Sequence, residues 1–527
     1  MDKSKLRASI FRHLDGIVMA PVVAVLAKHN TLDAILKTEK FDIDEFSSSI
    51  SANAGYLNVA LRVLASQGFL NYTVDNNQNK VSISLSDRFE KLLEFQEVYQ
   101  DLNAFITAEE TIRSAQVSDG ICQHWWQLFQ QYKEWLLEDI DEQDIRYQVQ
   151  KHIEGCLIGP VIVRLGMSGL FHNYFMQSRF SADEFHKNPE YFGKVLDGLA
   201  QMAWFRENKG FYEFTEQGLF FAKRAASYGV TVSYLPMFAA LEELIFGDAA
   251  AIRNLGQGEE ERHVDRAMNV WGSGGAHHTY FKVIDELIIE IFNRPIEEQP
   301  KGILDMGCGN GALLQHLYEI IERFTLRGKM LEEHPLFLVG ADYNQAALKA
   351  TRANLVKHEI WAKVIWGDIG DPDTLAAELK EVYKIDLSSL LNMRSFLDHN
   401  RIWEPTDAKG SLSTSTGAFA FRGQRLANNE VEASLKQHLE KWKPYVHKHG
   451  LLLIELHTIA PALTAANLGK TAATAYDATH GFSDQYIVEL DVFNKVCAEV
   501  GLQAEPRMVR RFPDSELATV SINLFKQ

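Results

Sequence analysis

A run of glycines in the second half of the chain could wrap a small ligand. The segment ILDMGCGNGALL places Asp305 in an apolar strand, glycines at positions 307, 309 and 311, and an apolar helix pattern after them. Glycine lets the backbone turn tightly and approach a ligand closely, and a helix amino end offers unpaired N–H groups. The pattern predicts a binding loop built from Asp305, Gly307, Gly309 and Gly311.

Two acidic residues further along the chain could grip the rest of that ligand. Asp342, followed by Tyr343, ends a second apolar strand, and Asp368 precedes Ile369 just after a third. A carboxylate at the first of these positions can accept both ribose hydroxyls of an adenosine. An acid beside an apolar side chain can hydrogen-bond the adenine amino group while the apolar side chain covers the ring. The ligand is therefore expected to contain adenosine.

Three histidines follow later strands and could supply acid–base chemistry. His399 lies in SFLDHNR, His457 ends an apolar strand in ELHTIAP, and His480 lies in YDATHGFSDQY. Histidine titrates near neutral pH and can accept a hydroxyl proton during a reaction. Because carboxyl ends of parallel strands meet at one crevice, all three are expected to converge, with His399 and His480 as the catalytic candidates.

The same histidines could instead hold a metal ion. Two histidines with an oxygen donor, either Gln485 or Asp398, would suit mononuclear iron or manganese. The ligand set expected here is His399, His480 and Gln485. The alternative, in which these histidines only hydrogen-bond to loops, stays open because spacing along the chain does not show convergence in space.

A sheet must position these side chains, and the sequence supplies seven candidate strands for it. They occupy residues 303–306, 337–342, 362–366, 385–391, 451–456, 503–509 and 519–525. Apolar strands that alternate with helix patterns predict an α/β fold, a Rossmann-like sheet. A Ser/Thr/Gly-rich insertion at residues 407–423 lies between the fourth and fifth strands, and it is expected to be either a mobile lid over the crevice or a disordered surface loop without a role.

The first half of the chain contains a degenerate repeat, in which FDIDEF is echoed by FSADEF. Each copy continues with an amphipathic helix and an alternating stretch around a polar turn, which predicts a β-hairpin. The copies comprise residues 41–46, 56–70 and 71–85, and residues 180–185, 191–205 and 206–215. Helix, helix and hairpin form a winged helix, so mainly helical tandem winged-helix domains are expected before the sheet.

The expected domains span residues 1–150, 151–255 and 256–527. The clearest boundary signals are QGEEE at 257–261 and GSGG at 272–275. The helices that would read DNA carry few basic residues, Arg62 in the first copy and Lys194 in the second, whereas DNA binding needs several. A structural, dimer-forming or substrate-covering role is therefore favoured over DNA binding.

Composition narrows the classes of partner. The 527 residues carry 53 basic and 70 acidic side chains, a net charge of −17, which repels nucleic acid and anionic membranes. The apolar patch at residues 16–26 is too short to span a bilayer and is expected to be a buried helix. Four widely separated cysteines without CxxC pairs indicate a reducing, cytoplasmic setting.

The GCGNG loop, with Asp305 before it and Ala341-Asp342 after the second strand, resembles motif I of class I S-adenosylmethionine-dependent methyltransferases. The resemblance covers about residues 260–527, and it implies a seven-stranded sheet closed by an antiparallel hairpin. It also implies that Asp305 and the glycines surround the methionine moiety of S-adenosylmethionine, that Asp342 binds the ribose, and that Asp368 and Ile369 bind the adenine.

Two further resemblances bear on the acceptor. Winged helices before such a domain resemble small-molecule O-methyltransferases, which implies a homodimer and a metal-free reaction with His399 as base. The three histidine motifs resemble metal-dependent C-methyltransferase domains of bacterial polyketide loading modules of the apratoxin type. That implies an ion that stabilises an enolate on a small-molecule or carrier-bound acyl substrate. A non-catalytic regulator that senses S-adenosylmethionine is a further alternative.

Overall fold

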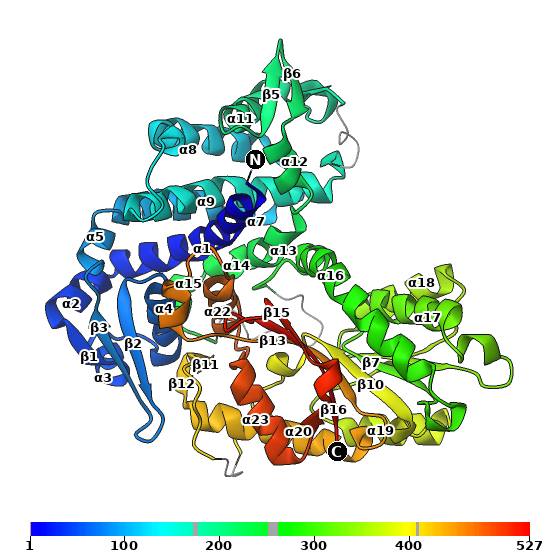
Figure 1. Cartoon of the computed structure of the whole chain (residues 1–527). Helices are drawn as coiled ribbons and strands as arrows, with labels where there is room; N and C mark the ends of the chain where they lie inside the picture. The colour runs from blue at the N-terminus through cyan, green and yellow to red at the C-terminus, as the bar shows by residue number, and fades with distance from the viewer. Residues whose placement is uncertain (1, 172–177, 251–261, 407–410) are drawn as a thin grey trace.

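The computed structural model describes residues 2–171, 178–250, 262–406 and 411–527, with the backbone alone at 275–279. The expected boundary at 255–256 and the first four residues of the 407–423 insertion lie outside the described residues. Figure 1 shows the first half of the chain, in blue to green, above and to the left of the large sheet of the second half.

A long helix, α1 (Lys3–Lys28), forms the centre of the first half. It packs along α9 (Ile145–Met167) so closely that a side chain on Gly16 would stand 2.4 Å from the Cα atom of His152. By length and hydropathy α1 could cross a membrane, but 83% of its most apolar 18-residue window is buried inside the protein. The apolar patch at residues 16–26 is thus part of a buried helix, as expected.

Both winged helices are present. The first has a three-stranded antiparallel sheet of order β1-β3-β2, and the second has one of order β4-β6-β5. The first comprises α2 (Thr31–Thr38), β1 (Lys40–Asp42), α3 (Ile43–Ser49), α4 (Ala54–Ser66), β2 (Leu70–Asp75) and β3 (Lys80–Leu85). The second comprises β4 (Phe180–Ser181), η1 (Ala182–Glu184), α11 (Pro189–Gln201), β5 (Phe205–Asn208) and β6 (Phe211–Phe214). The tandem winged-helix prediction is confirmed.

Further helices join the two winged helices around α1. They are α5 (Phe89–Leu93), α6 (Gln96–Ile106), α7 (Glu109–Arg113), α8 (Asp119–Leu137), α12 (Glu216–Ala222), α13 (Ala226–Ser233), α14 (Leu235–Phe238) and α15 (Leu241–Phe246). Aromatic residues of α8, among them Trp125 and Phe129, are buried in one continuous apolar core with α1 and α9. This burial explains the aromatic richness of that segment as packing.

The second half is built on a mixed sheet of order β14-β16-β13-β10-β7-β8-β9, with β15 also paired to β16. Five strands are parallel, and β16 runs antiparallel to β13, as the methyltransferase resemblance implies. The strands are β7 (Gly302–Met306), β8 (Phe337–Asp342), β9 (Lys363–Trp366), β10 (Leu390–Ser395), β13 (Leu451–Leu456), β14 (Gln503–Ala504), β15 (Arg510–Phe512) and β16 (Val520–Lys526).

Two strands differ from their expected limits. Of the sixth expected strand, residues 503–509, only Gln503 and Ala504 form a strand, β14, because Pro506 lacks the N–H that a ladder needs and η6 (Pro506–Met508) intervenes. A separate strand, β15, begins after it at Arg510, which makes eight strands instead of seven. The fourth begins five residues late. Asp386 caps a 3-10 turn, η4 (Leu387–Ser389), by accepting a hydrogen bond from the backbone N–H of Ser388.

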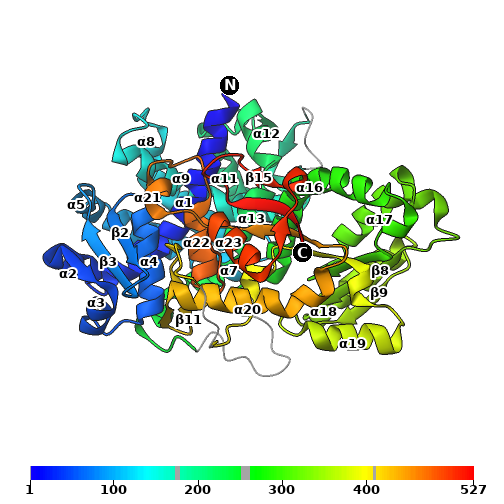
Figure 2. The ribbon, with the colours of Figure 1, turned by 60° about the horizontal axis from the view of Figure 1, so that its bottom comes forward.

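Helices cover both faces of this sheet. One face carries α16 (Arg266–Phe292), α17 (Ala312–Phe324) and α18 (Gln345–Lys357). The other face carries α19 (Pro372–Val382), α20 (Asn428–Val446) and α23 (Leu490–Val500), and Figure 2 shows α20 running along it. Asn344 begins α18 by accepting hydrogen bonds from two backbone N–H groups, which fixes the turn after β8.

The GSGG segment is not a boundary, because residues 272–275 lie inside α16. A side chain on Gly272 would stand 2.6 Å from the backbone nitrogen of Val230 in α13. The glycine there allows two helices to touch, so the composition that suggested a linker instead reflects close helix packing.

The 407–423 insertion contacts the first winged helix in its described part. Its end forms a hairpin, β11 (Phe419–Phe421) and β12 (Gln424–Leu426), that packs on α4. Asn76 donates hydrogen bonds to the carbonyl oxygens of Ser413 and Ser415 at 2.9 and 3.0 Å, and the N–H of Gly55 donates to Gly423 at 2.9 Å. This anchoring argues against a mobile lid for residues 411–423.

Candidate functional site

The glycine loop follows β7 at the carboxyl edge of the sheet. Gly307, Gly309 and Gly311 have φ angles of +79°, +55° and +76°, a left-handed conformation that glycine adopts most readily. A Cβ atom on Gly309 would meet nothing within 4 Å. The loop therefore has the tight backbone and the open side that a ligand cradle requires.

Asp305 lies under this loop in β7 and is only 2% exposed. Its Oδ1 atom has no hydrogen-bond partner among the described residues. Burial, together with the charge of Asp342, raises the pKa of Asp305 to about 7. A buried, unsatisfied carboxyl oxygen is costly in free energy, and a bound hydrogen-bond donor or cation would relieve that cost. Asp305 thus fits the amino-acid end of the expected cofactor.

The acids after the next two strands lie beside the loop. Parallel pairing aligns Met306 with Ala341, and Asp342 with Trp366. One oxygen of Asp342 accepts a hydrogen bond from the N–H of Gly309 at 3.0 Å, which ties the loop to β8. Since a carboxylate oxygen has more than one acceptor site, Asp342 can still accept a ribose hydroxyl.

The residues expected around the adenine have different exposures. The ring of Tyr343 is 61% exposed and lies 5.5 Å from that of Trp366, centroid to centroid. Asp368 accepts the N–H of Gly370 at 2.7 Å, and Ile369 is buried. Each residue thus stands at the strand end where the sequence placed it, and its contact with the cofactor stays a prediction.

His399 forms a buried dyad with a glutamate that the sequence analysis missed. Its Nδ1 atom lies 2.5 Å from Oε1 of Glu455, which is 2% exposed and belongs to β13. The other oxygen of Glu455 accepts the backbone N–H of Asp398 at 2.9 Å. The sequence did contain a signal for this residue, because Glu455 is an acid inside the apolar strand LLLIEL and a buried carboxylate needs a partner.

The dyad lies next to the glycine loop. β10, whose end leads to His399, pairs with both β7 and β13. A side chain on Gly307 would stand 2.9 Å from Leu397, two residues before His399. The structure therefore brings the expected base and the expected cofactor loop to one edge of the sheet.

His480 faces His399 from α22 (Ala473–Gly481). The two rings are 5.0 Å apart between centroids and nearly perpendicular. Nδ1 of His480 lies 2.8 Å from the carbonyl oxygen of Tyr476, and burial lowers the pKa of His480 to about 3, so this imidazole is neutral. Among the described residues, neither Nε2 atom has a hydrogen-bond partner, so both are available to a ligand.

Gln485 lies near this histidine pair, whereas both ring nitrogens of His457 are engaged elsewhere. The backbone N–H of Gln485 donates to the carbonyl oxygen of His480 at 3.0 Å, and its buried Oε1 lacks a partner in the described chain. His457 contacts Ser521 Oγ at 2.8 Å and the carbonyl oxygen of Val488 at 3.2 Å. The expected convergence of three histidines is therefore wrong for His457, because neighbouring elements occupy both of its nitrogens.

Asp398 has one oxygen engaged by other side chains, whereas its second oxygen, Oδ2, is buried and has no hydrogen-bond partner among the described residues. Asp398 pairs with Arg394 and lies 3.0 Å from Nε2 of His438, and these cationic or polar partners hold the pKa of its carboxyl far below the ordinary range. In the residues that the structure covers, no group of three or more His, Cys, Asp or Glu side chains could hold a metal ion. His399 and His480 nevertheless fit two metal ligands, since each Nδ1 is held by an acceptor, as is usual for such histidines.

Three family models match successive parts of the chain. They are the AprA N-terminal domain at residues 6–72, the AprA winged helix domain at 154–248, and the AprA MT2-like domain at 261–523. No curated protein sequence matches the chain.

Several solved structures are similar at low identity. Mitomycin 7-O-methyltransferase MmcR is 10% identical, with 72% of this chain and 97% of that one covered and a TM-score of 0.42. An O-methyltransferase family protein from Burkholderia thailandensis is 12% identical, with 70% and 94% covered and a TM-score of 0.39. The DszA carbon methyltransferase is 11% identical, with 83% and 92% covered and a TM-score of 0.33. With TM-scores below 0.5, these likenesses carry no weight in assigning a substrate.

Proposed function

Since the chain belongs to the AprA-type S-adenosylmethionine-dependent methyltransferases, we propose that it methylates a small-molecule or carrier-bound acyl substrate in polyketide-like secondary metabolism, with His399 as the proton acceptor. The observation that carries this proposal is the buried His399–Glu455 hydrogen bond beside the glycine loop. S-adenosylmethionine, when bound, supplies the methyl group on a sulfonium.

In the proposed reaction, Nε2 of His399 accepts the proton that the substrate loses from its nucleophilic oxygen or carbon. The bond between that atom and the methyl carbon forms as the methyl–sulfur bond breaks, which leaves a neutral thioether. Glu455 holds the Nδ1–H tautomer of His399 and stabilises the imidazolium, as a triad carboxylate does. The Asp305 carboxyl, Asp342, and Asp368 with Ile369 are proposed to hold the amino-acid end, the ribose and the adenine.

Calorimetry and turnover test this proposal. The purified chain should bind S-adenosylmethionine and release S-adenosylhomocysteine when offered the right acid, phenol or acyl thioester. His399→Ala should abolish release while keeping cofactor binding, and His358→Ala, on an exposed residue after α18, should change neither. Failure of the chain to bind the cofactor or its demethylated product would overturn the proposal.

A metal-dependent C-methylation is the second candidate. It is supported by two inward-facing imidazoles whose Nδ1 atoms are already engaged and by the unsatisfied Oε1 atom of Gln485. His399, His480 and Gln485 would hold iron or manganese, which would polarise a substrate carbonyl as a Lewis acid.

Elemental analysis separates the two candidates. Stoichiometric iron or manganese, with activity lost to a chelator and to His480→Ala, would favour the metal site. If metal-free protein remains active in the presence of the chelator and after the His480→Ala substitution, the result would favour O-methylation with His399 as the base.

The partners and setting of the protein are also proposals. Every residue of α4 from 55 to 66 is buried, which supports a structural role for the first winged helix over DNA binding or regulation. A low-salt gel shift would expose any DNA binding. The homodimer, to be tested by light scattering, and the cytoplasmic setting rest on the sequence alone.

A further inference from the structure

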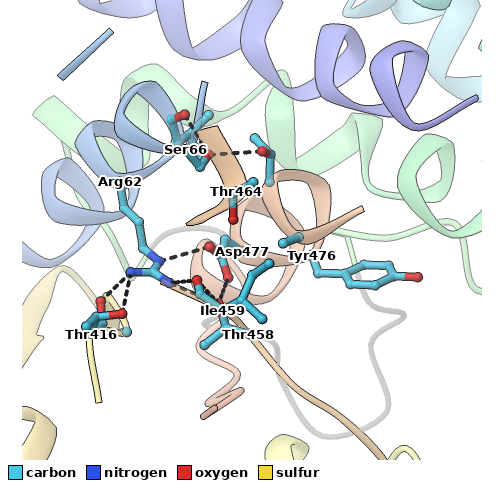
Figure 3. Close-up of polar contacts among 12 residues, drawn as sticks. Arg62, Ser66, Thr416, Thr458, Ile459, Thr464, Tyr476 and Asp477 are labelled. Atoms are coloured by element: carbon cyan, nitrogen blue, oxygen red, sulfur yellow. Dashed lines mark hydrogen bonds and ion pairs between the residues drawn. The ribbon is translucent and has the colours of Figure 1, made fainter. Parts of the chain in front are cut away.

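One arginine of the first winged helix reaches into the catalytic half of the chain. Arg62, in the middle of α4, is 1% exposed and contacts three separate segments there (Figure 3). Its Nε donates to Asp477 Oδ2 at 2.9 Å. One terminal nitrogen donates to Thr458 Oγ1 at 2.9 Å and to the carbonyl oxygen of Ile459 at 2.8 Å, and the other donates to the carbonyl oxygen of Thr416.

The partners of Arg62 adjoin the residues assigned to chemistry. Asp477 lies in α22, three residues before His480, and its second oxygen accepts a hydrogen bond from Thr458 at 2.5 Å. Thr458 follows β13, the strand that carries Glu455. A small cavity is lined in common by Arg62, Asp477 and Gln485, among others. One guanidinium thus fixes the helix of His480 and the segment after the strand of Glu455.

Stability alone does not explain a guanidinium at this position. A buried ion pair is often no more stabilising than apolar residues of similar volume, because removing two charges from water is costly. The guanidinium does offer five donors in a rigid planar fork, which can set the geometry of several acceptors at once. We propose that Arg62 is a positioning residue, which holds α22 and the segment after β13 so that His480 and Gln485 face His399.

This inference rests on the proposed methyl transfer, so its test includes a readout that needs no turnover. Arg62→Lys keeps the charge and loses the fork. Hydrogen exchange should quicken in peptides from residues 458–485, while peptides from residues 303–316 around the glycine loop and the Kd for S-adenosylmethionine stay unchanged. Once a substrate that the original protein methylates is known, kcat of the Arg62→Lys variant should be roughly ten- to a hundredfold lower, as expected for a small misplacement of reacting groups.

Arg164→Lys is the matched control. Arg164 is also 1% exposed, but the hydrogen bonds of its guanidinium go to Thr111, Ser114 and Pro160 within the first half. The Arg164→Lys variant should have a lower melting temperature, but its hydrogen exchange in residues 458–485 and its kcat per folded molecule should equal those of the original protein. If Arg62→Lys does not fold, Thr458→Val, which keeps the ion pair, should give the same local exchange with a smaller kcat loss.

Two outcomes overturn the inference. One is unchanged exchange in residues 458–485 of a folded Arg62→Lys or Thr458→Val variant. The other is an increase in hydrogen exchange in residues 458–485, or a loss of kcat, that the Arg164→Lys variant shows as well. Absence of any turnover by the unaltered protein would instead count against the proposed function, since the exchange measurement stands without it.

Discussion

Replacing Asp305 by asparagine should stabilise the cofactor-free protein at alkaline pH. Burial and the charge of Asp342 raise the pKa of this carboxyl from its ordinary 3.8 to about 7. The folded protein therefore holds a proton there that the unfolded chain has lost, so stability falls as pH rises from about 4 to about 7 and then levels off. Each pH unit in that interval costs about 1.4 kcal/mol, so the ionised carboxylate costs on the order of 4 kcal/mol above about pH 7.

Thermal unfolding followed by circular dichroism can test this prediction. The cofactor-free Asp305→Asn variant should exceed the original protein in stability by about 4 kcal/mol near pH 8 and by only about 2 kcal/mol near pH 5. Added S-adenosylmethionine should raise the melting temperature of the original protein and leave that of the variant unchanged, since the carboxylate is the proposed ligand group.

Asp33→Asn, on an exposed residue of α2, is the control and should behave as the original protein at both pH values. Our reasoning about Asp305 would be refuted by a variant that is less stable than the original near pH 8. If the cofactor raised the melting temperatures of the Asp305→Asn variant and the original protein equally, the proposed role of Asp305 in binding the cofactor would be refuted.

Four other substitutions probe the dyad, the loop and the helix core. His399→Ala should lower kcat, measured as S-adenosylhomocysteine release, by roughly 10²–10⁴-fold, and Glu455→Gln should lower it less. Loss of cofactor affinity in either variant would contradict the proposed roles of His399 as base and of Glu455 as its partner. Gly309→Ala should cost about 1–2 kcal/mol in a backbone with φ of +55° and weaken cofactor binding in calorimetry, whereas unchanged affinity would argue against the cradle. Gly16→Ala should destabilise the protein by about 1–3 kcal/mol or more, because the new methyl would stand 2.4 Å from His152, and an unaltered melting curve would disprove that close crossing.

Features encoded locally could be predicted from the sequence. Asp342 ends its strand as expected, and Asp368 follows the next one, because an apolar run, a turn and a helix pattern are all contained in neighbouring residues. The hairpins of both winged helices follow from polar turns between alternating stretches. The early end of the sixth strand, before Pro506, is also encoded locally, although the prediction extended that strand to residue 509. The separate strand β15 that follows pairs with the same partner, β16, as β14 does.

Features that depend on distant partners could not be predicted. Glu455 is separated from His399 by 56 residues, so only the folded sheet shows that they touch. His457 follows a strand and His480 lies in α22, and nothing in either local sequence shows that Ser521 and Val488, far along the chain, occupy both nitrogens of His457. Arg62 has the pattern of a solvent-exposed base on a DNA-reading helix, and it became a buried contact only because the insertion and α22 pack on α4.

The burial of α4 sets a practical limit on dissecting this enzyme. A fragment that begins at residue 262 would retain Asp477 without its ion-pair partner Arg62, and would uncover the apolar face of α22 that packs on α1 and α4, with Ala475 and Ala478. The β11–β12 hairpin would also lose the surface on which it packs and would present Ala418 and Ala420 to water. Such a fragment should precipitate or fold poorly, so the methyl-transfer half is expected to be workable only when its amino-terminal partner is expressed with it.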